Sequence, residues 1–564
     1  MRVSTRVKFA GVLFVPMLFL ASCIEDHGEG PAGAVAHADH HAGGAKTMPL
    51  FDNLGTHSHK ISTASAEAQA YFNQGYRFLF NFNHAAAISS FEEALKRDDK
   101  CAMCWWGIAF AHGPNINMPM MPDAVAPATH AIGMAQKLAP GASVAERAYI
   151  AALAKRYSSD AAADRGALDK AFMQAMRGVA KRYPRDLDAQ TLYAEALMDT
   201  SPWDYWQANR RMPKAGLEPL VPTLERVLKR APGHVGAMHL YIHAVENSTT
   251  PQRAEVYADR LGPSMPGAGH LVHMPTHIYN RIGRYEDGVV WNQKAAKADE
   301  AYLAATNDRG MYSAMYYVHN LHFVWTAATN DGRSALALEY AQRVLEKVQP
   351  KMALDLPPIQ AFVPTLLYAQ LRFGKWDDVL AARAPDPGLH YATAIWHYAR
   401  ARAFAMKGDV NAATRESALI APSFSEADGK VFQGFGVPGD DMVRIAGHVV
   451  RAEIARAKGD LPDAINELKA AVIAQDNLAY TEPPWWDFPT RQYLGAVLLQ
   501  AGRAGEAADV YRQDLKEWPK NGWSLFGLHA ALVKQGRTSE AAAAQSAYVK
   551  AWARADVELK ESRF

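Results

Sequence analysis

The chain has 564 residues, of which 49% are hydrophobic and 21% are charged, and its formal net charge at pH 7 is +2. This composition predicts a globular chain with a large core rather than a disordered one. The balanced charge argues against a nucleic-acid-binding protein, which needs a clustered excess of Lys and Arg.

The first residues have the pattern of an export signal. Basic residues at positions 2, 6 and 8 precede an apolar run at 9–20, which is too short to span a bilayer comfortably. The run ends in Leu20-Ala21-Ser22-Cys23, which resembles the lipobox of bacterial lipoproteins. The resemblance implies a signal peptide at 1–22 and a lipid on Cys23, which becomes the first residue. The alternative is an ordinary signal peptide with an incidental cysteine.

The residues after Cys23 predict a tether to the cell envelope. Ile24 stands where an inner-membrane lipoprotein carries Asp, so the resemblance favours the outer membrane over the inner one. Residues 23–62 are rich in Gly, Ala and His, which predicts a flexible linker. Four histidines of this linker are His27, His37, His40 and His41. They either recruit a metal weakly or are simply polar residues of a soluble spacer. We expect the rest of the chain to be soluble, lipid-anchored and facing the periplasm.

Internal repeats organise the remaining chain. Gly502, Arg503 and Ala507 recur 34 residues later as Gly536, Arg537 and Ala541, and 34 is the period of the tetratricopeptide (TPR) repeat. The segment 71–94 resembles the same pattern at its small and aromatic positions, which are Gly75, Ala87, Phe91 and Ala94. Five further glycines mark turns between apolar helical runs, namely Gly283, Gly332, Gly374, Gly408 and Gly459.

These repeats predict an all-α fold, a TPR-type solenoid of helical hairpins wound as a right-handed superhelix. We divide it into N-terminal repeats at 63–230, a histidine-rich part at 231–350 and C-terminal repeats at 351–556. The spacing is irregular between about 105 and 215, which indicates degenerate repeats there. No sustained period-two alternation predicts strands. Such a stack has a long concave surface suited to binding.

Cys101 and Cys104 form a Cys-x-x-Cys arrangement. Because Trp105 rather than His follows, the pattern does not match a haem-attachment motif. An oxidising compartment favours a local disulfide. The alternatives are soft-metal binding by reduced thiols and two inert buried thiols.

The histidines between 239 and 322 are the most informative residues. His239, His243 and Glu246 share one helical face, as do His270, His273 and His277. The pair His273 and His277 follows the pair His239 and His243 by one 34-residue repeat. His319 and His322 belong to the next repeat. In TPR proteins these helix positions face the concave groove, so the resemblance implies a groove lined by seven histidines.

Neutral imidazole is a common ligand of Zn, Cu, Fe and Ni. Seven histidines with Glu246 could therefore hold one ion with spare ligands, or two ions. The alternative is that they pack, hydrogen-bond or bind an organic ligand. We place copper first, because thioethers suit Cu(I) and Met118, Met120 and Met121 form a cluster. Zinc is second, and the His-Glu-x-x-His peptidase motif is absent because Leu240 follows His239.

Several runs resemble a family of long bacterial TPR proteins for which we can name no reaction. They are Cys104-Trp105-Trp106-Gly107, Gly113-Pro114-Asn115-Ile116-Asn117, His273-Met274-Pro275-Thr276-His277-Ile278-Tyr279 and Glu482-Pro483-Pro484-Trp485. The resemblance covers about residues 50 to 550. It implies the repeat architecture and supplies no catalytic residues.

Three functions remain open. The first is a metal-binding protein for storage, delivery or sensing. The second is a metalloenzyme, with an oxidoreductase favoured, in which Glu246, Tyr241 or Tyr279 assists the metal. The third is a scaffold that holds an envelope protein or a peptide in the groove. Nucleotide-binding glycine loops and a hydrolase nucleophile elbow are absent from the sequence.

Overall fold

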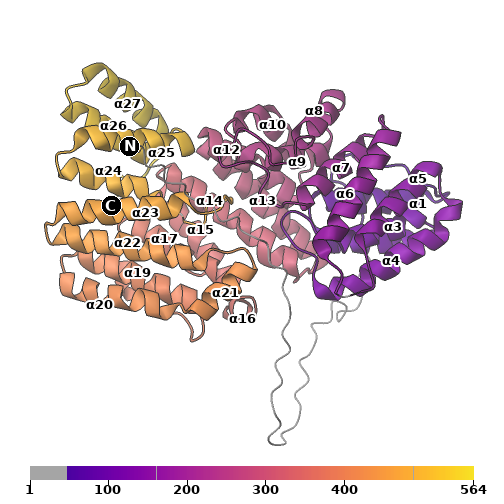
Figure 1. The fold of residues 1–564 in the computed structure, drawn as a ribbon, viewed down its shortest axis with the longest axis horizontal. Coiled ribbons are helices and arrows are strands. Elements are labelled where there is room, and N and C mark those ends of the chain that lie inside the picture. Colours follow the sequence, from indigo (N-terminus) through magenta and orange to yellow (C-terminus); the bar gives the residue numbers. More distant parts are fainter. Residues whose placement is uncertain (1–47, 161, 487) are drawn as a thin grey trace, which may run out of the picture. The chain divides into compact units, whose positions relative to one another are not determined.

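Helical hairpins build the fold (Figure 1). The computed structural model describes residues 48–160, 162–486 and 488–564. Each turn predicted from a glycine lies between two helices and has its φ between 65° and 83°, the left-handed region that favours glycine. The seven predicted turns are therefore confirmed; they are at Gly283, Gly332, Gly374, Gly408, Gly459, Gly502 and Gly536.

The first half of the described chain contains thirteen α-helices. They are α1 (Ala66–Phe80), α2 (His84–Leu95), α3 (Ala102–Ala111), α4 (Val125–Leu138), α5 (Val144–Leu153), α6 (Arg165–Arg182), α7 (Leu187–Asp199), α8 (Leu220–Arg230), α9 (Val235–Glu246), α10 (Glu255–Ser264), α11 (Gly269–His273), α12 (Pro275–Ile282) and α13 (Tyr285–Thr306). Short 3₁₀ turns join some of them.

The second half begins with a π-helical turn, η5 (Tyr312–Tyr317). Its α-helices are α14 (Val318–Asn330), α15 (Ser334–Lys347), α16 (Pro350–Asp355), α17 (Thr365–Arg372), α18 (Trp376–Ala381), α19 (His390–Met406), α20 (Val410–Ile420), α21 (Glu426–Gly434), α22 (Gly439–Ala457), α23 (Leu461–Asp476), α24 (Thr490–Gln500), α25 (Ala504–Glu517), α26 (Gly522–Lys534) and α27 (Thr538–Ala551). The residues that the structure describes contain isolated bridges but no strand. The predicted all-α, TPR-type fold is confirmed.

Small residues let neighbouring helices approach closely around one aromatic ring. A Cβ added to Gly75 of α1 or to Gly107 of α3 would lie 2.6 Å from the ring of Phe91 on α2. The same arrangement recurs near the end of the chain, where Gly495 and Gly527 lie on either side of the Tyr511 ring. These contacts explain why the repeat pattern pairs glycine with a large aromatic residue.

Two predictions about the N-terminal part have different outcomes. The signal peptide, the lipidated Cys23 and the tether before residue 48 lie outside the described residues. Residues 48–62, which the sequence assigns to the same tether, pack on the repeats instead: Leu54 and Ile61 are buried, and the Phe51 amide donates to Gln74. In the described part of the chain, no helix has both the length and the apolar character to cross a membrane.

Two hydrophobic cores meet along α13. Tyr302 of this helix belongs to the core of the first helices, whereas Val289 and Ala296 belong to the core that continues to the C-terminal end. The histidine-rich part at 231–350 therefore has no core of its own. Its helices α9, α11 and α12 pack in the first core and α14 packs in the second.

Candidate metal centre

Six of the predicted histidines come together from four helices. α9 supplies His239 and His243, α11 supplies His270 and His273, and α12 and α14 supply His277 and His319. We call His239, His243 and His270 the first triad, and His273, His277 and His319 the second triad. Within each triad, one nitrogen of every imidazole lies within 4.8 Å of the others.

Local sequence explains how α11 and α12 present their histidines. Gly269 starts α11 because a Cβ there would lie 1.8 Å from an oxygen of Asp299. Pro275, which has no amide hydrogen to donate, then begins a new helix directly after Met274. The predicted start of this helix at Gly269 is confirmed, whereas the break at Pro275 was not expected.

Four of the six imidazoles are held through Nδ1 by hydrogen-bond acceptors. His239 Nδ1 lies 2.8 Å from the carbonyl oxygen of Phe80, and His273 Nδ1 lies 2.7 Å from Oδ1 of Asn292. The amide orientation of Asn292 is fixed, because its Nδ2 donates to Thr276 and to the Gly288 carbonyl. Since these partners accept hydrogen bonds, Nδ1 carries the hydrogen in both imidazoles.

Glu246 connects the two triads. Its Oε1 lies 2.8 Å from Nδ1 of His243, in the first triad, and its Oε2 lies 2.6 Å from Nδ1 of His277, in the second. Both carboxylate oxygens are therefore engaged by imidazole N–H groups. A carboxylate that accepts the outer N–H of a histidine fixes the orientation of a metal ligand.

The inner nitrogens point at one another. His239 Nε2 lies 3.2 Å from His270 Nε2, and His273 Nε2 lies 2.9 Å from His277 Nε2. Because His273 and His277 both carry hydrogen on Nδ1, each presents a lone pair on Nε2 when neutral. Two lone pairs at this distance repel unless a proton or a cation lies between them. His243 Nε2 is buried without any hydrogen-bond partner.

Burial keeps most of these imidazoles neutral. It lowers the pKa of His239, His270, His273 and His319 well below the usual value, and the neighbouring histidines lower it further. For His277, burial opposes protonation, but attraction to Glu246 outweighs it and raises the pKa. Burial likewise opposes ionisation of Glu246, yet the two imidazoles lower the pKa of this carboxyl to about 2. Neutral imidazoles are the form that binds metal.

Aromatic rings enclose the two triads. The ring of Phe82 lies 4.5 Å from that of His239, and the ring of Phe323 lies 4.5 Å from that of His273. Trp203 lies 5.1 Å from His243, ring centre to ring centre. Phe82 and Trp203 have φ values of 53° and 64°, a left-handed conformation that costs a large side chain about 1–3 kcal/mol. The fold therefore holds both rings over the histidines at a cost in backbone energy.

Other residues predicted for the site lie elsewhere. His322 belongs to neither triad; its ring packs on Trp325 and Phe362, and burial lowers its pKa to about 3. His319, on the same helix α14, joins the second triad instead.

The two tyrosines suggested as catalytic helpers bind carboxylates outside the triads. The hydroxyl of Tyr241 donates to Glu225 at 2.8 Å, and that of Tyr279 donates to Asp259 at 2.7 Å. The suggested soft ligands are also engaged elsewhere: Cys101 and Cys104 form a disulfide, and the Met120 sulfur lies 3.4 Å from Arg165. Glu246 is at the centre but supports histidines rather than presenting a free oxygen.

Sequence reasoning missed several residues at the centre, because they come from distant segments. Asn292 has no histidine pattern to mark it, and Phe82 and Trp203 lie in connections. Tyr480 reaches the site from the C-terminal repeats: its hydroxyl lies 3.3 Å from Glu246 and 2.6 Å from Glu482. Burial and the nearby Glu246 raise the pKa of Glu482 to about 7.

A second histidine group lies around Asp188 and has a different geometry. Oxygens of Asp188 lie 3.1 Å from Nε2 of His57, 2.7 Å from Nδ1 of His59 and 3.1 Å from Nε2 of His234. However, His234 Nδ1 accepts the amide hydrogen of Ala237 and so caps α9. Its hydrogen must then be on Nε2, which donates to Asp188 and has no lone pair for a metal. This group fastens residues 57–59 to α7 and α9.

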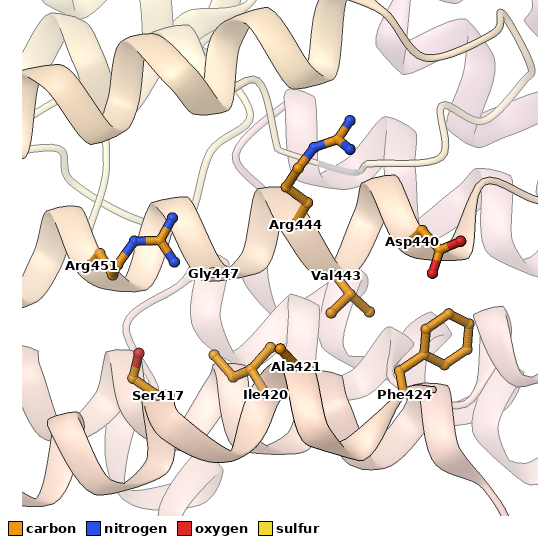
Figure 2. A pocket seen from close by; sticks show the side chains of 9 residues that line it. All are labelled: Ser417, Ile420, Ala421, Phe424, Asp440, Val443, Arg444, Gly447 and Arg451. Carbon is orange, nitrogen blue, oxygen red and sulfur yellow. The ribbon is translucent and has the colours of Figure 1, made fainter. Parts of the chain in front are cut away.

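Two cavities lie outside the triads. One of about 350 Å³ lies between α20 and α22 and is lined by residues such as Ile420, Phe424 and Val443 (Figure 2). Its arginines Arg444 and Arg451 pair with Asp441 and Glu467. The other, of about 440 Å³, is lined by residues of both halves of the chain, including Trp206, Arg281, Tyr480, Glu482 and Trp485. Through Tyr480 and Glu482 it adjoins the carboxylate side of the metal centre.

Comparisons with known proteins give a likeness of fold only. No family model and no curated protein matches the sequence. Human IFIT1 in a dimer with m7Gppp-AAAA is 11% identical, with 87% of this chain and 91% of that chain covered and a TM-score of 0.31. The APC/C hetero-tetramer Cut9-Hcn1 gives 13% identity, 87% and 95% coverage and a TM-score of 0.28. Naa15/Naa10 bound to HypK-THB gives 14% identity, 86% and 70% coverage and a TM-score of 0.21.

Proposed function

We propose that this protein binds transition-metal ions, copper first and zinc second, through the two histidine triads. One observation carries the proposal: inner imidazole nitrogens face one another at 2.9 and 3.2 Å, while acceptors hold the outer nitrogens of His239, His273 and His277. In a tetrahedral site with metal–nitrogen distances of about 2.0–2.1 Å, two ligand nitrogens lie roughly 3.3 Å apart. The observed separations are close to that value.

The charge of the site supports the same proposal. Glu246 is buried and ionised, and it is within hydrogen-bonding distance of two imidazoles. A buried negative charge needs a compensating positive one. Metal ions held by His243 in the first triad and by His277 in the second would supply that charge while leaving both Nδ1–H groups on the carboxylate.

Imidazole nitrogens alone suit copper and zinc rather than calcium or magnesium, which prefer oxygen ligands. With the disulfide formed and Met120 next to Arg165, these three sulfurs no longer favour copper. Copper remains the first choice because three neutral imidazoles accommodate both of its oxidation states. The proposal includes the predicted lipid anchor on Cys23, which would place the centre in the cell envelope.

The test is the metal content of the exported, untagged protein, measured by plasma mass spectrometry. We expect one or two copper or zinc ions per chain, and a loss of at least one ion when His243 and His277 are both replaced by Gln. His322→Gln is the matched control, since this histidine is also buried on α14 but lies outside the triads. The His234→Gln variant, in the Asp188 group, should also retain its metal.

Circular dichroism must show that each variant keeps its helices and a cooperative thermal transition. A folded wild-type protein that contains no metal, and takes up none from micromolar copper or zinc, would refute the proposal. The remaining function would then be a scaffold, in which the helical hairpins hold a protein partner.

A further inference from the structure

We propose that the two triads form one binuclear copper centre that binds dioxygen between its two ions. This inference rests on the proposed function, since it requires copper in both triads. It goes further by stating that the two ions act together, and by naming the small molecule that they bind.

The two triads are direct neighbours. Ring centres within the first triad are 4.9 and 5.0 Å apart for His239 with His270 and with His243. Between the triads, His243 lies 5.1 Å from His277, and His270 lies 5.7 Å from His273. The spacing across the boundary is therefore almost the same as the spacing within a triad. Ions held by adjacent triads of this kind are close enough to share a bridging ligand, as in other two-metal sites.

Shared supports also join the triads. The carboxylate of Glu246 holds one imidazole of each triad, and the five-residue helix α11 supplies His270 to one and His273 to the other. A displacement of either support would move ligands of both ions. Two unrelated mononuclear sites would not need common supports.

Each ion would keep an open coordination position. A triad provides three nitrogens, whereas a closed tetrahedral site needs four ligands. Among the described residues, the only carboxylate grouped with these histidines is Glu246, and imidazole N–H groups engage both of its oxygens. The fourth ligand of each ion must then come from outside the chain, and one small molecule placed between the ions can serve both.

The surroundings select a small, uncharged molecule. Five of the six histidines are at most 2% exposed. Phe82, Phe323 and Tyr316 pack on their rings, at 4.5, 4.5 and 4.8 Å between ring centres. A bulky or strongly hydrated substrate would have to displace these side chains. Dioxygen is small and apolar enough to reach the ions through ordinary side-chain motion.

The charge balance fits dioxygen reduction to bound peroxide. Each of two Cu(I) ions gives one electron to dioxygen, so two Cu(II) ions and one bridging peroxide result. The O–O bond order falls from two to one, two copper–oxygen bonds form, and no proton is required. The ions and their bound oxygen carry a total charge of +2 before and after the step. A buried site can therefore perform this step without taking up a charge from water.

The experiment loads the full-length protein with Cu(I) without oxygen and then mixes it with air-saturated buffer. Copper content, electron paramagnetic resonance and oxygen consumption are measured on the same sample. We expect two copper ions per chain and one dioxygen consumed per two copper ions. The oxidised protein should show little of the paramagnetic signal of its copper, because two bridged Cu(II) ions couple their spins.

Two variants on one helix make the test specific. His319→Gln should retain the copper of the first triad, show a full Cu(II) signal on oxidation and lose the fast oxygen uptake. His322→Gln should behave as the wild type. Two copper ions with a full, uncoupled signal, or one copper ion per chain, would overturn the binuclear inference and leave metal binding standing. A folded protein without copper or zinc would remove the proposed function itself.

Discussion

Replacing Glu246 by Gln tests how the outer nitrogens of the imidazoles control the metal centre. The substitution keeps the size of the side chain but replaces one acceptor oxygen by an NH₂ group. Either His243 or His277 then faces a donor instead of an acceptor. That imidazole must move its hydrogen to Nε2, the nitrogen that should bind the metal, or rotate away.

The expected loss can be estimated from the contacts. Removing a group that orients a histidine ligand typically costs 10- to 100-fold in metal affinity, or about 1.4–2.7 kcal/mol. Glu246→Gln should weaken by this amount the binding of the ion whose imidazole faces the NH₂ group, and weaken the binding of the other ion less, because a neutral amide oxygen is a weaker acceptor than a carboxylate. Asn292 supports only His273, so Asn292→Leu should weaken the second triad alone. Asn292→Asp, which can still accept the hydrogen of Nδ1, is the control.

The assay is a competition titration of each apo variant with copper against a chelator of known affinity, at fixed pH and ionic strength. Two binding steps should appear in the wild type; both should shift in Glu246→Gln and one in Asn292→Leu. Unchanged affinity in Glu246→Gln, with its helical content intact, would show that the carboxylate does not orient metal ligands. The tautomer argument would then be wrong.

Three further predictions concern stability. Burial lowers the pKa of His322 to about 3. At pH 4–6 this imidazole is therefore protonated in the unfolded chain but neutral in the folded one. Stability then falls as the pH falls. His322→Gln should therefore reduce the slope of unfolding free energy against pH by about 1.4 kcal/mol per pH unit, measured by urea denaturation. Gly502→Ala should lower the free energy of unfolding by about 1–2 kcal/mol, because its φ is positive. Gly283→Ala should lower it by at least about 1 kcal/mol more, because the new Cβ would also lie 2.2 Å from the Pro519 carbonyl oxygen. Equal losses in the two variants would contradict this contact. Replacing both cysteines of the disulfide by Ser should lower stability by about 2 kcal/mol, as expected for a four-residue loop, without changing the metal content.

The sequence predicts the helical hairpins well because their signals are local. A glycine between two apolar helical runs marks a left-handed turn wherever it occurs, and all seven such turns are present. The pairing of small residues with a large ring, as for Gly75 with Phe91, is likewise a property of adjacent helices. The 48–62 segment was mistaken for tether because its few apolar residues, such as Leu54, are buried only by distant helices.

The composition of the candidate metal centre is only half predictable, because part of it is brought together by packing rather than by local sequence. Helical spacing brings His239 and His243 together, and the 34-residue repeat brings the next pair beside them. It does not reveal that α11 divides its histidines between two triads, or that His322 packs on Trp325 and Phe362 outside them. Asn292, Phe82 and Tyr480 carry no pattern at all, since they meet the histidines only through packing.

The two histidine groups of this protein show why spacing and even proximity are insufficient evidence for a metal site. Around Asp188, three imidazoles approach one carboxylate as closely as those of the triads approach each other. The difference lies in the partner of the remote nitrogen. A backbone N–H donates to Nδ1 of His234, so the hydrogen of this imidazole is on Nε2, which then has no lone pair for a metal. A carbonyl, an amide oxygen and a carboxylate accept from Nδ1 of four of the six triad imidazoles, which leaves the Nε2 lone pairs of these four free for a metal. The hydrogen bonds behind the imidazoles, rather than the imidazoles alone, distinguish the candidate metal centre from the structural cluster.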